Sequence, residues 1–271
     1  MPGAVYKILR IPQSLIMVTR HLMRWPMRTA SSVLGIALSV SVLVGSLWAF
    51  GSIEFMIDVT YHRADRQDAT IRFVQERPMA ALFAATSLPG VMAAEPFRSV
   101  PVEIRHGHVE RRIAITGKPS GTALTRVLGS DFEPIRLPES GVALSAALAK
   151  ILDARIGDIV EVELLERDRR LARLPVTAII EGYLGLTAYM DLTAANSLLR
   201  EGPMISGVHL LYDPAQSDAL FRRLKSTPVA SFIGLQKVSL QKFRDTMAEN
   251  LLVMISVYVS LGAIVAFGVV Y

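Results

Sequence analysis

The sequence predicts an α+β domain carried outside a membrane between two transmembrane helices. The first observation is two long stretches without any charged residue, residues 29–53 and 250–271. As helices they would be roughly 33–38 Å long, enough to cross a hydrocarbon core of roughly 30 Å. A buried core helix, the alternative for each stretch, is usually shorter and amphipathic. The second observation is that the residues between them alternate short strand-like and helix-like patterns, which predict a mixed domain.

Basic residues are concentrated before the first apolar stretch. No acidic residue precedes Glu54. Five basic residues precede it and account for the whole net charge of +5: Lys7, Arg10, Arg20, Arg24 and Arg28. Because Lys and Arg are enriched on the cytoplasmic side of membrane helices, residues 1–28 are expected in the cytoplasm, against lipid headgroups. Residues 54–249 have balanced charge, which argues against nucleic acid as a partner.

The basic segment itself has helical spacing. Arg20, Arg24 and Arg28 recur every four residues and would form one stripe of a helix lying in the membrane interface. The alternative is a basic flank without a defined helix. Because no A-x-A cleavage site follows the apolar run, we expect a retained anchor in an inner, cytoplasmic membrane, with the large domain outside.

Both apolar stretches contain small residues at helical spacing. The first transmembrane helix is expected at 29–53 and the second at 249–271. Small side chains let helices approach closely in a membrane. The candidates for helix packing are Gly35, Ser39, Gly45, Gly262 and Ala266.

The outside domain, residues 54–248, begins and ends with a strand–helix–strand unit. The two units are expected at residues 69–74, 78–87 and 91–97, and at residues 206–213, 214–226 and 229–235. A hairpin with Gly107 in its turn follows the first unit. The two parts, about 66–118 and 204–240, would pair into one antiparallel sheet with helices on one face, a split ferredoxin-like arrangement. Strand-rich residues 136–203 between them predict a small β-barrel-like insert.

Signals for catalysis are weak. The stretch 117–122 has Gly-Lys, but Pro119 replaces the Ser or Thr of a phosphate loop. The chain has no cysteine, and His106 and His108 form a close pair without an evident third metal ligand. We therefore expect no catalytic, cofactor-binding or metal-ligating residue, and no enzymatic activity in this chain.

Glu95 and Arg98 flank a Pro-Phe step at an expected strand end. One interpretation is a local ion pair that closes the strand. The other is a contact between subdomains that moves when the membrane helices move.

The order of these features resembles a known family. "RWPMRT" at 24–29, "VLGIAL" at 33–38, the stretches 140–164 and 188–199, and "FRDTMAEN" at 243–250 are similar to FtsX-like (MacB-like) permease subunits of ABC transporters. The resemblance implies a permease that couples ATP hydrolysis by a separate ATPase subunit to movement of the external domain, for export, extraction or mechanotransmission. It also implies a second permease half or a homodimer partner, and a periplasmic adaptor.

Two other functions fit the same layout. One is a two-helix membrane sensor with an external ligand domain, and the other is a membrane-anchored binding or adaptor protein. The resemblance is to the second half of long permeases that are built from two halves. Members of that family continue with further membrane helices, so the resemblance implies that this chain is truncated in its second helix.

Overall fold

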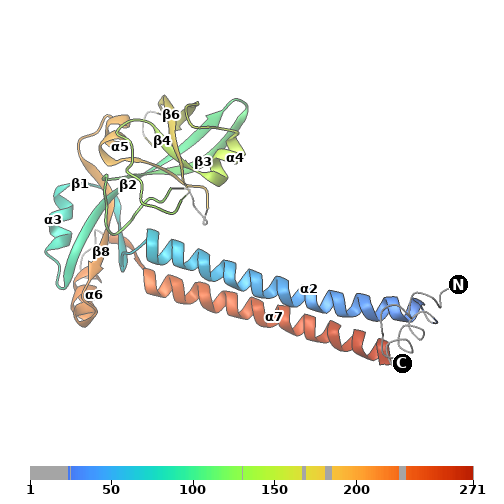
Figure 1. The fold of residues 1–271 in the computed structure, drawn as a ribbon. Coiled ribbons are helices and arrows are strands. Elements are labelled where there is room, and N and C mark those ends of the chain that lie inside the picture. The colour runs from blue at the N-terminus through green and yellow to red at the C-terminus, as the bar shows by residue number, and fades with distance from the viewer. Residues whose placement is uncertain are drawn as a thin grey trace. The chain divides into compact units, whose positions relative to one another are not determined.

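The computed structural model describes residues 24, 26–129, 131–166, 169–180, 185–225 and 230–270 (Figure 1). The chain divides into two compact units. The first comprises residues 1–53 and 244–271 and contains two long helices. The second comprises residues 54–243 and contains all the strands of the described chain.

Helix α2 (Pro26–Ile57) contains the first predicted transmembrane stretch. Proline suits the first position of a helix, where its missing N–H has no partner to lose. The apolar helix continues through the π-helix η1 (Asp58–Ala64), further than the predicted end at residue 53, and Ile57 and Val59 are buried. The mean hydropathy reaches 2.2 over 18 residues of the span Val33–Ala64, which is the one helix among the described residues that is long and apolar enough to cross a membrane.

Helix α7 (Gln236–Val270) contains the second predicted stretch, whose passage through a membrane stays a prediction. It begins before residue 249 because residues 236–249 are rich in Lys, Gln, Leu, Met, Ala and Glu, which are good helix formers. Leu252, Val253 and Val259 are exposed on this helix within the single chain.

A four-stranded antiparallel sheet forms one half of the second unit. It contains β1 (Ala69–Pro78), β8 (Met204–Tyr212), β9 (Ala230–Leu235) and the first part of β2 (Val91–His106), in the order β2-β8-β1-β9. Helix α3 (Ala80–Thr86) connects β1 to β2, and α6 (Ser217–Lys225), preceded by the 3₁₀ turn η2 (Pro214–Gln216), connects β8 to β9. Both helices pack on one face of the sheet, through Ala85, Leu220 and Leu224.

A closed six-stranded barrel forms the other half. Its strands follow the order β2-β3-β7-β4-β6-β5, and β5 pairs back onto β2. The added strands are β3 (Val109–Lys118), β4 (Val142–Ser145), β5 (Ile159–Leu164), β6 (Leu171–Ile180) and β7 (Ala188–Asp191). Inward side chains fill a small barrel, and here they pack with α4 (Ala146–Leu152) and α5 (Leu192–Leu198) into one apolar core.

The hairpin is where the sequence predicted it, but it belongs to the barrel. Gly107 has a φ of 59° at the first turn position, which glycine adopts without strain. Strand β2 pairs with β5, and β3 pairs with β7, so both hairpin strands extend the insert expected at 136–203. The cause is that β2 is one strand of 16 residues, not two.

Strand β2 accommodates two prolines. Pro96 pairs with β8 on one side, in the part of the strand that has no second neighbour. Pro101 directs its carbonyl toward Leu165, just outside the β2–β5 pairing that starts at Val102. A proline is tolerated where its missing N–H is not needed in the ladder, so neither proline ends the strand.

Candidate functional site

Strand β2 passes from the sheet to the barrel between Phe97 and Arg98. Phe97 is the last β2 residue paired with β8, opposite Gly207, and Arg98 is the first paired with β3, opposite Gly117. Gly207 leaves room for the Phe97 ring, since an added Cβ would lie 2.6 Å from it. We call this region the junction: Phe97, Arg98 and the residues that contact Arg98.

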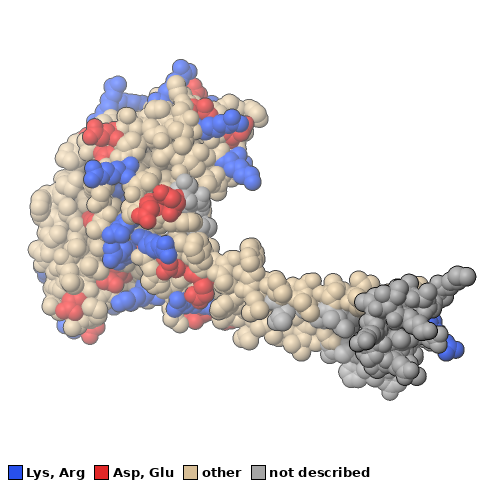
Figure 2. Space-filling model, viewed as in Figure 1, with Lys and Arg blue, Asp and Glu red and all other residues tan. Residues whose placement is uncertain are grey.

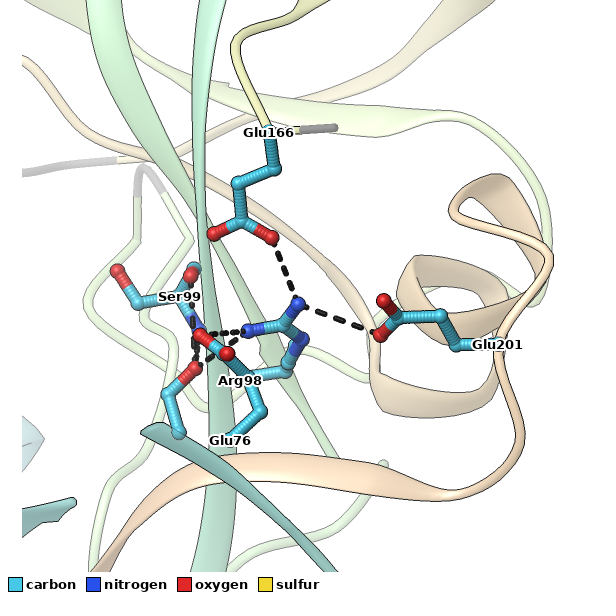
Figure 3. A network of polar contacts seen from close by, with 6 residues as sticks. Glu76, Arg98, Ser99, Glu166 and Glu201 are labelled. Carbon is cyan, nitrogen blue, oxygen red and sulfur yellow. Dashed lines mark hydrogen bonds and ion pairs between the residues drawn. The ribbon is translucent and has the colours of Figure 1, made fainter. Parts of the chain in front are cut away.

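Arg98 is 1% exposed and is the centre of the junction (Figure 3). Its guanidinium binds side chains from four different segments of the chain. Nη1 lies 2.8 Å from Glu76 Oε1 and donates to Ser206 Oγ at 2.9 Å. Nη2 lies 2.7 Å from Glu166 Oε2 and 3.3 Å from Glu201 Oε2.

The partners of Arg98 come from both halves of the unit. Glu76 and Ser206 belong to strands β1 and β8 of the sheet, Glu166 follows β5 of the barrel, and Glu201 follows α5. Ser206 Oγ also accepts the N–H of Ser99 at 3.0 Å. One buried side chain therefore ties the sheet to the barrel.

The junction carries more negative than positive charge. Three carboxylates surround one guanidinium, and its Nε has no hydrogen-bond partner among the described residues. Burial raises the pKa of Glu166, and Arg98 opposes that rise. Because breaking a buried ion pair leaves an uncompensated charge, the cluster resists separation of its members more than a surface pair does.

Glu95 does not join this cluster. Its carboxylate accepts the backbone N–H groups of Ala123 at 2.6 Å, Leu124 at 3.0 Å and Thr125 at 3.3 Å. The interpretation of Glu95 and Arg98 as a local pair at a strand end is wrong, because residues three apart on a strand point to opposite faces. Both side chains instead bind partners far along the sequence.

The loop that Glu95 binds also binds the residues that leave η1. Arg66 N–H donates to the carbonyl of Leu124 at 2.7 Å, and Arg126 N–H donates to the carbonyl of Ala64 at 2.8 Å. Asp65 and Thr125 thus form an isolated antiparallel bridge. We call residues 64–66 the strap and residues 122–126 the receiver loop.

Ionisable groups with shifted pKa values lie in the strap and near it. Burial raises the pKa of Asp65 and lowers the pKa of Lys118, and the two charges partly offset these shifts. The ammonium of Lys118 lies 4.9 Å from the centre of the Tyr189 ring, a cation–π distance. Burial, and then the charges of Lys118 and Arg72, lower the pKa of His209 to about 3.

Asp68 connects the start of β1 to the start of α7. Its carbonyl accepts the N–H of Gln236 at 2.9 Å, and its carboxylate lies 3.7 Å from Lys237 Nζ. The same carboxylate accepts the N–H of Tyr212 on β8 at 3.3 Å. The sequence gives no local sign of these contacts, since Asp68 lies outside every pattern used to locate a strand or a helix.

The helix-packing candidates of the first unit stay predictions. Gly35 is buried, whereas an added Cβ at Gly45 or Gly262 would meet nothing within 4 Å in the single chain. The side chains of Ser39 and Ala266 lie outside what the structure describes.

The basic anchor is described in part. Arg24 is helical and exposed, whereas Arg20 and the side chain of Arg28 lie outside the described residues.

The two histidines of the hairpin do not converge on a metal ligand set. His106 Nδ1 lies 2.9 Å from the carbonyl of Leu152, and its Nε2 lies 3.9 Å from Asp158. In the parts of the chain that the structure describes, no group of three His, Cys, Asp or Glu residues could hold a metal ion. Figure 2 shows acidic and basic side chains interspersed on the visible face of the second unit.

Comparisons with known proteins give fold neighbours only. No family model matches the sequence, and no curated protein matches it. The periplasmic region of MacB from Actinobacillus actinomycetemcomitans is similar over 69% of this chain and 98% of that one, with 12% identity and a TM-score of 0.43. The extracellular domain of the noncanonic ABC-type transporter YknZ from Gram-positive bacteria covers 62% of this chain and 98% of its own, with 10% identity and a TM-score of 0.39.

Proposed function

We propose that this chain is a membrane subunit, or part of one, of an ABC transporter of the FtsX-like (MacB-like) kind. A separate ATPase would supply ATP hydrolysis, and the chain would convert it into movement of the α+β unit outside an inner membrane. The order of elements along the chain supports this proposal. It is a basic flank, an apolar helix, the α+β unit and a returning helix. The strand order β2-β8-β1-β9 with α3 and α6 on one face fits a ferredoxin-like sheet.

The observation that carries the proposal is the way both long helices enter the sheet. Helix α7 begins at Gln236, directly after Leu235 of β9, without a linker. On the other side, η1 leads through the strap to β1, and Asp68 binds both Gln236 and Lys237. Because no flexible segment separates helix from strand at β9, displacement of α7 would pass directly to the sheet.

The proposed partners follow from this role. They are an ATPase subunit in the cytoplasm, a second permease half or a second copy of this chain, the lipid bilayer, and a periplasmic adaptor. No catalytic or cofactor-binding residue is proposed in this chain, since ATP would bind the partner subunit.

Residues 1–271 contain no cysteine, so labels can be attached at chosen positions among them. The full gene product would be purified from native membranes in mild detergent, with cysteines introduced at the exposed positions Lys150 on α4 and Lys225 on α6 for spin labels. We expect an ATPase subunit to co-purify and the distance between the labels to differ between ATP-bound and nucleotide-free complexes. If the chain is recovered without an ATPase and the distance between the labels does not change with nucleotide, a sensor or adaptor is favoured.

A further inference from the structure

The strap and the receiver loop are joined by two backbone hydrogen bonds that flank the Asp65–Thr125 bridge. Leu124 accepts from Arg66, and Arg126 donates to Ala64. On the loop side of this contact, Thr125 is 1% exposed and Leu124 is 6% exposed. A two-sided backbone pairing of this kind needs the loop to present its carbonyl and N–H groups in a fixed direction.

The Glu95 carboxylate helps to fix that direction. It accepts three consecutive N–H groups, those of Ala123, Leu124 and Thr125, at 2.6–3.3 Å. Thr122 Oγ1 closes the turn by donating to the carbonyl of Thr125 at 2.6 Å. Charge-assisted hydrogen bonds are about twice as strong as neutral ones, so Glu95 contributes strongly to the loop's conformation.

The receiver loop belongs to the barrel by connection, and the strap belongs to the helix side. The loop follows β3 and precedes β4, which are both barrel strands, whereas the strap begins at Ala64, the last residue of η1. Without the bridge, residues 64–68 would be a short tether between η1 and β1. With it, the end of η1 is joined to the barrel as well as to the sheet.

We infer that Glu95 and the receiver loop form a clamp that grips the strap and makes the barrel follow the end of η1. The use of this clamp in coupling rests on the proposed function. Glu95 is a positioning residue in it: the carboxylate binds three N–H groups of the loop, and the loop binds the strap. Helix α7 reaches the sheet through β9 and Asp68, whereas the end of η1 reaches the sheet through β1 and the barrel through the receiver loop.

Hydrogen–deuterium exchange of the full chain in lipid nanodiscs tests the clamp without any ATPase. The variant Glu95→Gln keeps the size of the side chain and removes its charge. We expect exchange of the amides in residues 122–127 and 64–68 to become about tenfold faster or more, because the bonds that protect them are weakened. The matched control Glu110→Gln changes a surface carboxylate that pairs with Arg105, and it should leave both segments unchanged.

A second variant guards against loss of folding. Glu95→Asp keeps the charge but shortens the side chain by one methylene, so the carboxylate cannot reach all three N–H groups. If exchange rises in 122–127 but not in 64–68, the grip does not depend on Glu95 and the inference is overturned. Unchanged protection of strands β8 and β9 shows that the sheet is still folded.

The assembled complex separates this inference from the proposed function. Spin labels at His62 of η1 and Lys150 of α4 report displacement of the η1 end against the barrel. If nucleotide changes the distance between the two labels in the parent and changes it equally in Glu95→Gln, the clamp is contradicted. A parent that shows no response contradicts the proposed function, and the exchange result alone then decides the clamp.

Discussion

Phe97 and Arg98 are neighbours on one strand and pair with different halves of the unit. Phe97 lies opposite Gly207 of the sheet, and Arg98 lies opposite Gly117 of the barrel. A continuous strand cannot rotate freely about this step while both ladders are intact. The junction therefore sets how far the sheet and the barrel can move against each other.

Replacing Arg98 by methionine should destabilise the second unit strongly. The change leaves Glu201, which is 6% exposed in its side chain, and Glu166 without their shared cation. Removal of one partner from a buried ion pair costs about 3–5 kcal/mol. Urea unfolding of the full chain in detergent, followed by circular dichroism, measures the difference in free energy.

Arg173→Met is the matched control, because Arg173 pairs with Glu161 at 3.0 Å on the barrel surface. An exposed pair of this kind contributes at most about 1 kcal/mol. Adding Glu201→Gln to Arg98→Met should recover part of the loss, since it removes one of the negative charges that Arg98 offsets. If Arg98→Met and Arg173→Met lowered the free energy of unfolding equally, the burial of the junction would be contradicted.

Gly207→Ala should disrupt the sheet at the junction. An added Cβ would collide with the carbonyl oxygen of Ile71 and lie 2.6 Å from the Phe97 ring. Overpacking of a filled site costs about 1–3 kcal/mol or more. Gly202→Ala is the control, because its Cβ would meet nothing within 4 Å. A thermal unfolding midpoint of Gly207→Ala that equals that of Gly202→Ala would be inconsistent with the observed packing.

Local patterns in the sequence predicted both strand–helix–strand units and the hairpin. Period-two alternation located β1, and the glycine between two strand-like runs located the turn at Gly107. These features depend on neighbouring residues, and the structure has them at the expected positions. The continuity of β2 could not be predicted, because Pro96 and Pro101 read as breaks until the neighbouring strands are known.

The candidate site was predicted only in part. The sequence singled out Glu95 and Arg98, but the partners of Arg98 at Glu166 and Glu201 are 68 and 103 residues away. Such contacts depend on which strands pair, and that is set by the packing of the whole unit. The strap and the receiver loop bind through backbone groups, which every residue carries, so no residue type marks them in the sequence.

Gly45→Ile and Gly262→Ile should leave the second unit intact and weaken assembly in the membrane. Within the single chain, both positions have open space where a Cβ would be. If a partner helix packs there, as the proposed function requires, a large side chain keeps the helices apart. Native gel analysis of the detergent-solubilised complex would show less assembled material, with unchanged urea unfolding. A complex of unchanged size and yield would contradict helix packing at these glycines.

Acid should destabilise the second unit through His209. Its folded pKa of about 3 lies below the ordinary value of 6.5, so between these values the unfolded chain binds a proton that the folded chain does not. Stability from this group is therefore present above pH 6.5 and is lost as the pH falls toward 3. Asp65 and Glu166 act with the opposite sign, because burial raises their folded pKa values.

A comparison with His209→Asn isolates the histidine, and His62→Asn on the exposed η1 surface is the control. Between pH 6.5 and 4.5, urea unfolding of the parent should lose about 2 kcal/mol more than that of His209→Asn. Parallel pH profiles for the parent and His209→Asn would mean that the ring can be protonated in the folded state at ordinary pH.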